Sequence, residues 1–126
     1  EFLRKHANEE MDHMNRLFTY VSETGALPII GAIEAAPHEF ETLGQLFELT
    51  YEHERLITAR INSLAHEAFS GQDYSTFNFL QWYVAEQLEE EALAHDILDK
   101  LKLIGGNAGG LYMFDRDVAS FHQKPE

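Results

Sequence analysis

The sequence predicts an all-α protein with three long helices and a short fourth one. Apolar residues recur at helical spacing over three long stretches, and the glycines and prolines that would interrupt a helix are confined mostly to the segments between them. The chain has 126 residues, the length of one ordinary domain, so we expect a single domain over residues 1–126. Hydrophobic residues make up 44% of the chain, which is enough to build a core.

The composition excludes several classes of function. Asp and Glu number 22 against 9 Lys and Arg, and the formal net charge is -13. Nucleic acids and anionic membrane surfaces are bound by clustered Lys and Arg, so we expect neither as a partner. The absence of cysteine excludes disulfide scaffolds, thiolate zinc sites and cysteine nucleophiles. No apolar run approaches the ~20 residues of a membrane span and no signal peptide is recognised, so we expect a cytoplasmic protein, and its acidity suits the collection of cations.

The first two predicted helices have recognisable ends. The first covers residues 1–24 and stops before Gly25, a residue that is common just past a helix end. The second covers residues 42–70, and Thr42 and Gln45 at its start have the spacing of a capping box.

The remaining helices and the connections predict a topology. The third helix covers residues 73–104 and ends at two glycines, and a short fourth one covers about residues 111–121. The link between the second and third helices is short, which predicts antiparallel neighbours. About 17 residues, 25–41, separate the first and second helices, and this length suits a crossover between parallel helices. Because the chain is already within the helical period at its first residues, we expect a further helix upstream that completes a four-helix bundle.

Polar side chains interrupt the apolar stripe of each long helix near its middle. Glu10 and His13 lie on the first helix, Glu54 on the second, and Gln87 and Glu90 on the third. Residues three apart point from the same helical face, so both spaced pairs can address one site. A buried carboxylate without a partner costs several kcal/mol, and we place no Lys or Arg on these stripes, so we expect a bound metal cation. Oxygen ligands with one imidazole and no thiolate favour iron or manganese.

This ordered set of motifs resembles the bacterial non-haem ferritins. Residues 2–14 resemble the second helix of that family, residues 51–54 the metal-ligand turn of its third, and residues 78–91 its fourth. Gly110-Leu111-Tyr112 leads into the short fifth helix. The resemblance implies an all-α, ferritin-like four-helix bundle with a long crossover and a short C-terminal fifth helix, of which this chain lacks the first bundle helix.

The resemblance also implies an iron-storage protein with ferroxidase activity. A 24-subunit shell would oxidise Fe(II) to Fe(III) with oxygen or peroxide and store the ferric mineral. The residues implied for the di-iron centre are Glu10, His13, Glu54, Gln87 and Glu90. Those implied for a third iron site nearby are Glu9, Glu86, Glu89 and Glu90.

Three alternatives stay open beside this interpretation. The chain could be a structural shell subunit with an incomplete, inactive site, or a helical interaction module with a polar core and no metal. A bacterioferritin is the third, because Met11 lies at the position of that family's haem-binding Met. Bacterioferritins have His at the position of Glu90, however, so we do not expect haem.

Overall fold

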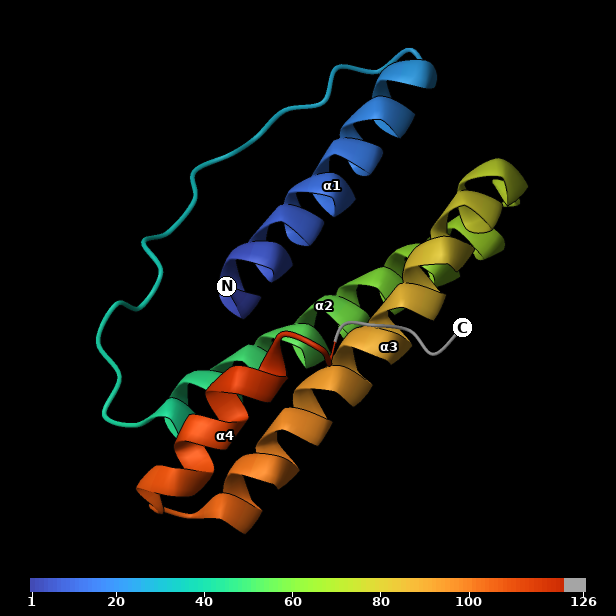
Figure 1. The fold of residues 1–126 in the computed structure, drawn as a ribbon. Helices are drawn as coiled ribbons and strands as arrows, with labels where there is room; N and C mark the ends of the chain where they lie inside the picture. The colour runs from blue at the N-terminus through green and yellow to red at the C-terminus, as the bar shows by residue number, and fades with distance from the viewer. Residues whose placement is uncertain (122–126) are drawn as a thin grey trace. The chain divides into compact units, whose positions relative to one another are not determined.

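The computed structural model describes residues 1–121; the last five residues of the expected domain, 122–126, lie outside the described part. Within residues 1–121 there are four α-helices and no strand, which confirms the predicted all-α class (Figure 1). None of the helices within residues 1–121 combines the length and the apolar character that a membrane span needs. The helices are α1 (Phe2–Glu23), α2 (Leu43–Ser70), α3 (Tyr74–Ile104) and α4 (Ala108–Val118).

The chain divides into two compact units, which we describe separately. The first, residues 1–38, contains α1 and most of the long connection, and the second begins at residue 39 and contains the other helices. As predicted, α1 ends before Gly25, whose positive φ of 82° suits glycine. Residues 26–40 form neither helix nor strand. The side chains of Leu27, Ile29 and Ile33 there are about 80% exposed.

The capping residues explain where α2 begins. The Thr42 hydroxyl accepts a hydrogen bond from the backbone N–H of Gln45 at 3.0 Å, and the Gln45 side-chain oxygen accepts one from the backbone N–H of Glu41 at 2.7 Å. The first bond satisfies a backbone donor that the first helical turn leaves over, and the second one ties the residue before the cap to the same turn. The predicted cap is therefore confirmed.

Side-chain caps also fix the starts of α3 and α4. Asp73 accepts hydrogen bonds from the backbone N–H of Thr76 at 3.0 Å and from its hydroxyl at 2.6 Å. The Asn107 side chain accepts from the backbone N–H of Gly110 at 2.9 Å. Because of this cap, α4 begins at Ala108, three residues before the predicted start at Leu111.

The core of the second unit lies between α2 and α3, which run antiparallel as predicted (Figure 1). Its buried apolar side chains come from one face of each helix and from α4: Phe47, Ile61, Ala65, Ala68, Leu80, Tyr83, Ala94, Ile97, Leu98, Leu101, Phe114 and Val118. The ring of Phe114 packs edge-on against Phe47 with 6.2 Å between centroids, which seats α4 against the start of α2.

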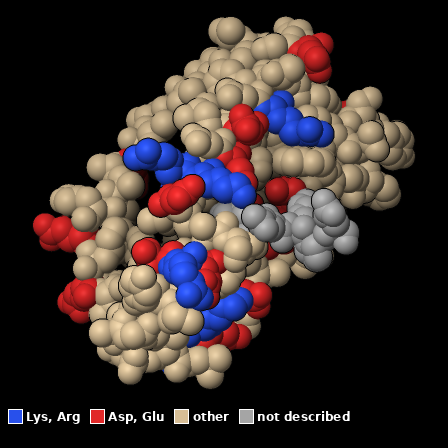
Figure 2. Space-filling model, viewed as in Figure 1, with Lys and Arg blue, Asp and Glu red and all other residues tan. Residues whose placement is uncertain are grey.

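Charged side chains pair along the helix surfaces. Lys100 lies 3.6 Å from Asp96, and Arg116 lies 2.6 Å from Asp117. Figure 2 shows Lys and Arg side chains with Asp and Glu side chains beside them.

Candidate metal centre

In the first unit, α1 presents two imidazoles on either side of one carboxylate. The Nδ1 atom of His13 lies 3.3 Å from Oε2 of Glu10, and Nε2 of His6 lies 3.8 Å from Oε1. The spacings of three and four residues place all three side chains on one helical face. Glu10 keeps 46% of its side chain exposed, and both His side chains are exposed much less.

The neighbouring Glu9 lies at the edge of this face. Its carboxylate is 3.8 Å from the Lys5 ammonium and 4.0 Å from Nδ1 of His6. A carboxylate shared between an ammonium and an imidazole stays available as an oxygen ligand if the lysine swings away, since exposed ion pairs are weak.

In the second unit, a buried carboxylate on α2 meets a buried amide on α3. Glu54 is 5% exposed and Gln87 is 4% exposed. The Gln87 side-chain nitrogen donates to the Glu54 carboxylate at 3.1 Å and to the Glu54 backbone oxygen at 3.3 Å. The same nitrogen lies 3.4 Å from the hydroxyl oxygen of Thr58. Three acceptors from α2 therefore surround one amide group of α3.

The other predicted ligands of α3 lie close to Gln87 in sequence. Glu90 follows it by three residues, on the same helical face, and is buried. Glu86 is half-buried and Glu89 is exposed.

The donor set of the second unit fits a cation. Within residues 39–121, no Lys or Arg forms an ion pair with Glu54, and its hydrogen-bonding partner there is a neutral amide. An amide donor lowers the cost of burying a carboxylate but does not balance its charge. A cation such as Fe(II), bound by carboxylate and amide oxygens, would balance it.

The structure thus brings together part of the predicted set within each unit. Glu10 and His13 meet on α1, and Glu54 and Gln87 meet between α2 and α3. The contact of Thr58 with Gln87 was not predicted from the sequence. The available signal was the position of Thr58 one turn after Glu54, on the same face.

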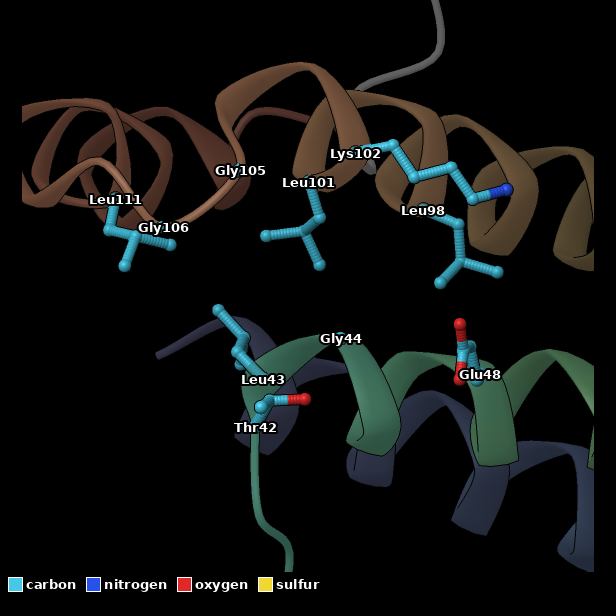
Figure 3. A pocket seen from close by; sticks show the side chains of 10 residues that line it. All are labelled: Thr42, Leu43, Gly44, Glu48, Leu98, Leu101, Lys102, Gly105, Gly106 and Leu111. Atoms are coloured by element: carbon cyan, nitrogen blue, oxygen red, sulfur yellow. The ribbon is translucent and has the colours of Figure 1, made fainter.

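A separate hollow lies where α4 and the end of α3 meet the start of α2 (Figure 3). Its volume is about 490 Å³ and none of the predicted ligands lines it. Leu43 of α2 and Leu98, Leu101 and Leu111 from α3 and α4 point toward the gap between the helices, and Lys102 and Glu48 lie at one side. Leucine side chains cannot coordinate a metal ion, so we do not assign this hollow to the metal centre.

Antiparallel helices that bury carboxylate and amide groups, with a Glu-x-x-His pair on a further helix, are typical of helical proteins that bind iron or manganese through carboxylates. The family described as ferritin-like domain matches residues 1–104 of this sequence. The chain therefore belongs to the ferritin family, and the ferritin-like fold class predicted from the sequence is confirmed.

Similar relatives of known name narrow the assignment within the ferritin family. A probable bacterial non-heme ferritin-like protein of Haemophilus influenzae is 53% identical over 124 residues, which cover 98% of this chain and 75% of that protein. A bacterial non-heme ferritin of Escherichia coli is 55% identical over 119 residues, covering 94% and 72%. The Campylobacter jejuni bacterial non-heme ferritin is 50% identical over 117 residues, covering 93% and 70%. The resemblance to bacterial non-haem ferritins is thereby confirmed.

Solved structures agree with this assignment. An open pore ferritin from Archaeoglobus fulgidus matches with a TM-score of 0.92 and 41% identity, covering 98% of this chain and 74% of that one. A ferritin from Chlorobium tepidum matches with a TM-score of 0.81 and 46% identity, covering 93% and 72%.

Proposed function

We propose that this protein is an iron-storage ferritin that oxidises Fe(II) at a two-iron centre and keeps the ferric product inside a shell of 24 copies. Membership of the ferritin family supports iron storage. The observation that carries the ferroxidase proposal is the buried Glu54 carboxylate, whose hydrogen-bonding partner in the second unit is the neutral Gln87 amide. We further propose that both units belong to one domain.

Iron enters this centre as substrate and leaves it as cargo. Glu10 and His13 bind the first ion, Glu10 and Glu54 bridge or bind the pair, and Gln87 and Glu90 complete the centre. A third iron ion binds nearby, and its ligands are Glu9, Glu86, Glu89 and Glu90. The third ion has more carboxylates around it, which suits a Fe(III) ion on its way to the store.

Two ions at one centre match the electron count of the reaction. Each Fe(II) gives up one electron, so a pair supplies the two electrons that reduce O₂ with two protons to H₂O₂, or H₂O₂ with two protons to two waters. The bridging carboxylates hold the ions at a fixed spacing and offset their charge. The protein therefore contributes geometry, charge and open coordination positions.

Gln87 makes the centre release iron. An amide oxygen is a neutral and weaker ligand than a carboxylate, so it leaves one ion loosely held. In Gln87→Glu, a second carboxylate would face Glu54 and bind iron more tightly, and we expect slower iron turnover over repeated additions. Unchanged turnover would contradict this role for the amide.

Oxygen consumption after anaerobic loading with Fe(II) tests the ferroxidase proposal. We expect Glu54→Gln to lower the rate by on the order of 10- to 100-fold or more, the range seen when groups that support a metal centre are removed. Glu52→Gln is the matched control, because Glu52 is exposed on the same helix and carries the same change. Equal rates in the two variants would contradict the proposal. A shell that consumes no oxygen even with the natural sequence would instead indicate a structural subunit.

The shell and its surroundings form the rest of the proposal. We propose self-association into 24 copies, no nucleic-acid or membrane partner, and a cytoplasmic location. The net charge of -13 supports attraction of iron ions and gives no basis for binding polyanions. Light scattering on the purified protein should give the mass of 24 chains.

A further inference from the structure

We propose that Thr58 is a positioning residue that allows the Gln87 amide to release the Glu54 carboxylate to iron. The inference rests on the proposed function, since it concerns the same centre. It assigns a role to a hydroxyl group that the ligand set above does not include.

The orientation of the Gln87 amide is determined by its neighbours. Its nitrogen lies 3.3 Å from the Glu54 backbone oxygen and 3.1 Å from the Glu54 carboxylate. Both of these atoms are acceptors only, so the amide group that faces them must be the NH₂. A flipped amide would bring three oxygens together in a buried place. The amide oxygen of Gln87 is therefore the atom left to serve as a ligand.

The count of donors and acceptors then gives Thr58 its role. The NH₂ group of Gln87 has two N–H bonds, and three acceptors lie within reach: two on Glu54 and the hydroxyl of Thr58 at 3.4 Å. Without metal, the two Glu54 acceptors suffice. Thr58 is the acceptor in excess, and it is the most distant of the three.

Iron binding changes this balance. If the Glu54 carboxylate held iron, its oxygens would face the metal and its bond to the Gln87 amide would weaken. One N–H bond then needs another acceptor, because a buried donor without one is costly. The Thr58 hydroxyl and the Glu54 backbone oxygen are the two acceptors that remain. Thr58 thereby removes the competition between amide and iron for Glu54.

This role predicts an effect confined to the metal-bound state. In Thr58→Val the shape of the side chain is kept and the acceptor is lost, so the amide holds on to Glu54 and metal affinity falls. We expect a loss of about 3- to 10-fold, the size of one neutral hydrogen bond. Without metal, Thr58→Val should unfold at nearly the same temperature as the natural protein. Thr58→Ser keeps the hydroxyl and should restore most of the affinity.

Titration with Co²⁺, followed by its visible absorption, measures the affinity without redox chemistry. The purified protein is compared with Thr58→Val, Thr58→Ala, Thr58→Ser and Glu54→Gln, and thermal unfolding of each is recorded without metal. Thr50→Val is the matched control, since Thr50 is half-buried on the same helix and its hydroxyl donates to the Leu46 carbonyl instead. We expect weaker binding in the Val and Ala variants of Thr58 only, among the threonine changes.

Each outcome separates the inference from the function on which it rests. If Glu54→Gln weakens Co²⁺ binding but Thr58→Val does not, the role of Thr58 is wrong and the metal centre stands. If Glu54→Gln binds Co²⁺ as the natural protein does, the centre itself is wrong. If removal of the hydroxyl lowers the unfolding temperature without metal and leaves the affinity unchanged, Thr58 is structural and the inference is overturned.

Discussion

The middle of the α2–α3 pair and the end at which α2 begins are equally buried, but the contact in the middle is polar and the contact at the end is apolar. On α2, Phe47 is 4% exposed and Glu54, two turns later on the same face, is 5% exposed. Phe47 packs against the ring of Phe114, whereas Glu54 meets the amide of Gln87. Burial alone therefore does not tell the two positions apart: the apolar contact stabilises the fold, whereas the polar contact gives a buried carboxylate only a neutral partner.

Replacing the polar pair should separate activity from stability most strongly. In Glu54→Leu with Gln87→Leu, side chains of similar size fill the space without polar groups. We expect iron oxidation to fall by about 100-fold and the free energy of unfolding to stay equal or rise by about 1–4 kcal/mol. Oxygen consumption and urea unfolding measure the two effects. A large loss of stability in the double variant would show that the polar contact holds the helices together.

Phe47 gives the opposite test, in which stability should fall and metal affinity should stay the same. Phe47→Ala removes a buried ring that contacts Phe114, so we expect a loss of about 3–5 kcal/mol in the free energy of unfolding. Co²⁺ affinity of the protein that remains folded should not change. Phe69→Ala is the control, because Phe69 lies on the same helix and is 56% exposed. Similar losses at the two phenylalanines would mean that burial at this end is not what stabilises the pair.

Gly110 tests how closely α4 packs against the end of α3. A Cβ atom on Gly110 would lie 2.7 Å from Cγ2 of Ile104, whereas one on Gly106 would meet nothing within 4 Å. We expect Gly110→Ala to cost about 1–3 kcal/mol by overpacking and Gly106→Ala to cost much less. Thermal unfolding compares the two. Equal values would indicate that α4 is loosely seated on α3.

The smallest expected effect lies at the turn between α2 and α3. Hydrogen bonds from the hydroxyl and the backbone N–H of Thr76 lower the pKa of Asp73 below its ordinary value of 3.8. A carboxyl whose pKa is lowered by folding stabilises the protein fully above its unfolded pKa and loses that contribution as the pH falls through the folded one. The unfolding temperatures of the natural protein and Asp73→Asn should therefore converge in acid. A constant difference between pH 6 and pH 2 would contradict the assignment.

The sequence predicts the three long helices to within a residue or two because interactions between residues close in sequence determine where they begin and end. The Thr42–Gln45 cap and Gly25 act over one turn, so no tertiary information is needed. The start of α4 is missed because Asn107 follows two glycines, and its capping role depends on the conformation they adopt.

The site is predicted less completely, for a physical reason. Helical spacing places Glu54 and Gln87 on facing stripes, and the structure joins them by a hydrogen bond. Spacing cannot say which atoms of an amide face which neighbour, because this depends on side-chain rotamers across two helices. The contact of Gln87 with Thr58 is of that kind, and the assignment of the iron ligands stays a prediction.

Glu54 and Gln87 are 33 residues apart in sequence, yet the turn between their helices covers only residues 71–73. Two helices joined so tightly form a hairpin, whose contacts close a small loop and are reached early when a chain folds. This half of the centre should therefore exist in a single newly made chain, before any copy meets another. Iron would then find paired acid and amide groups already in the monomer.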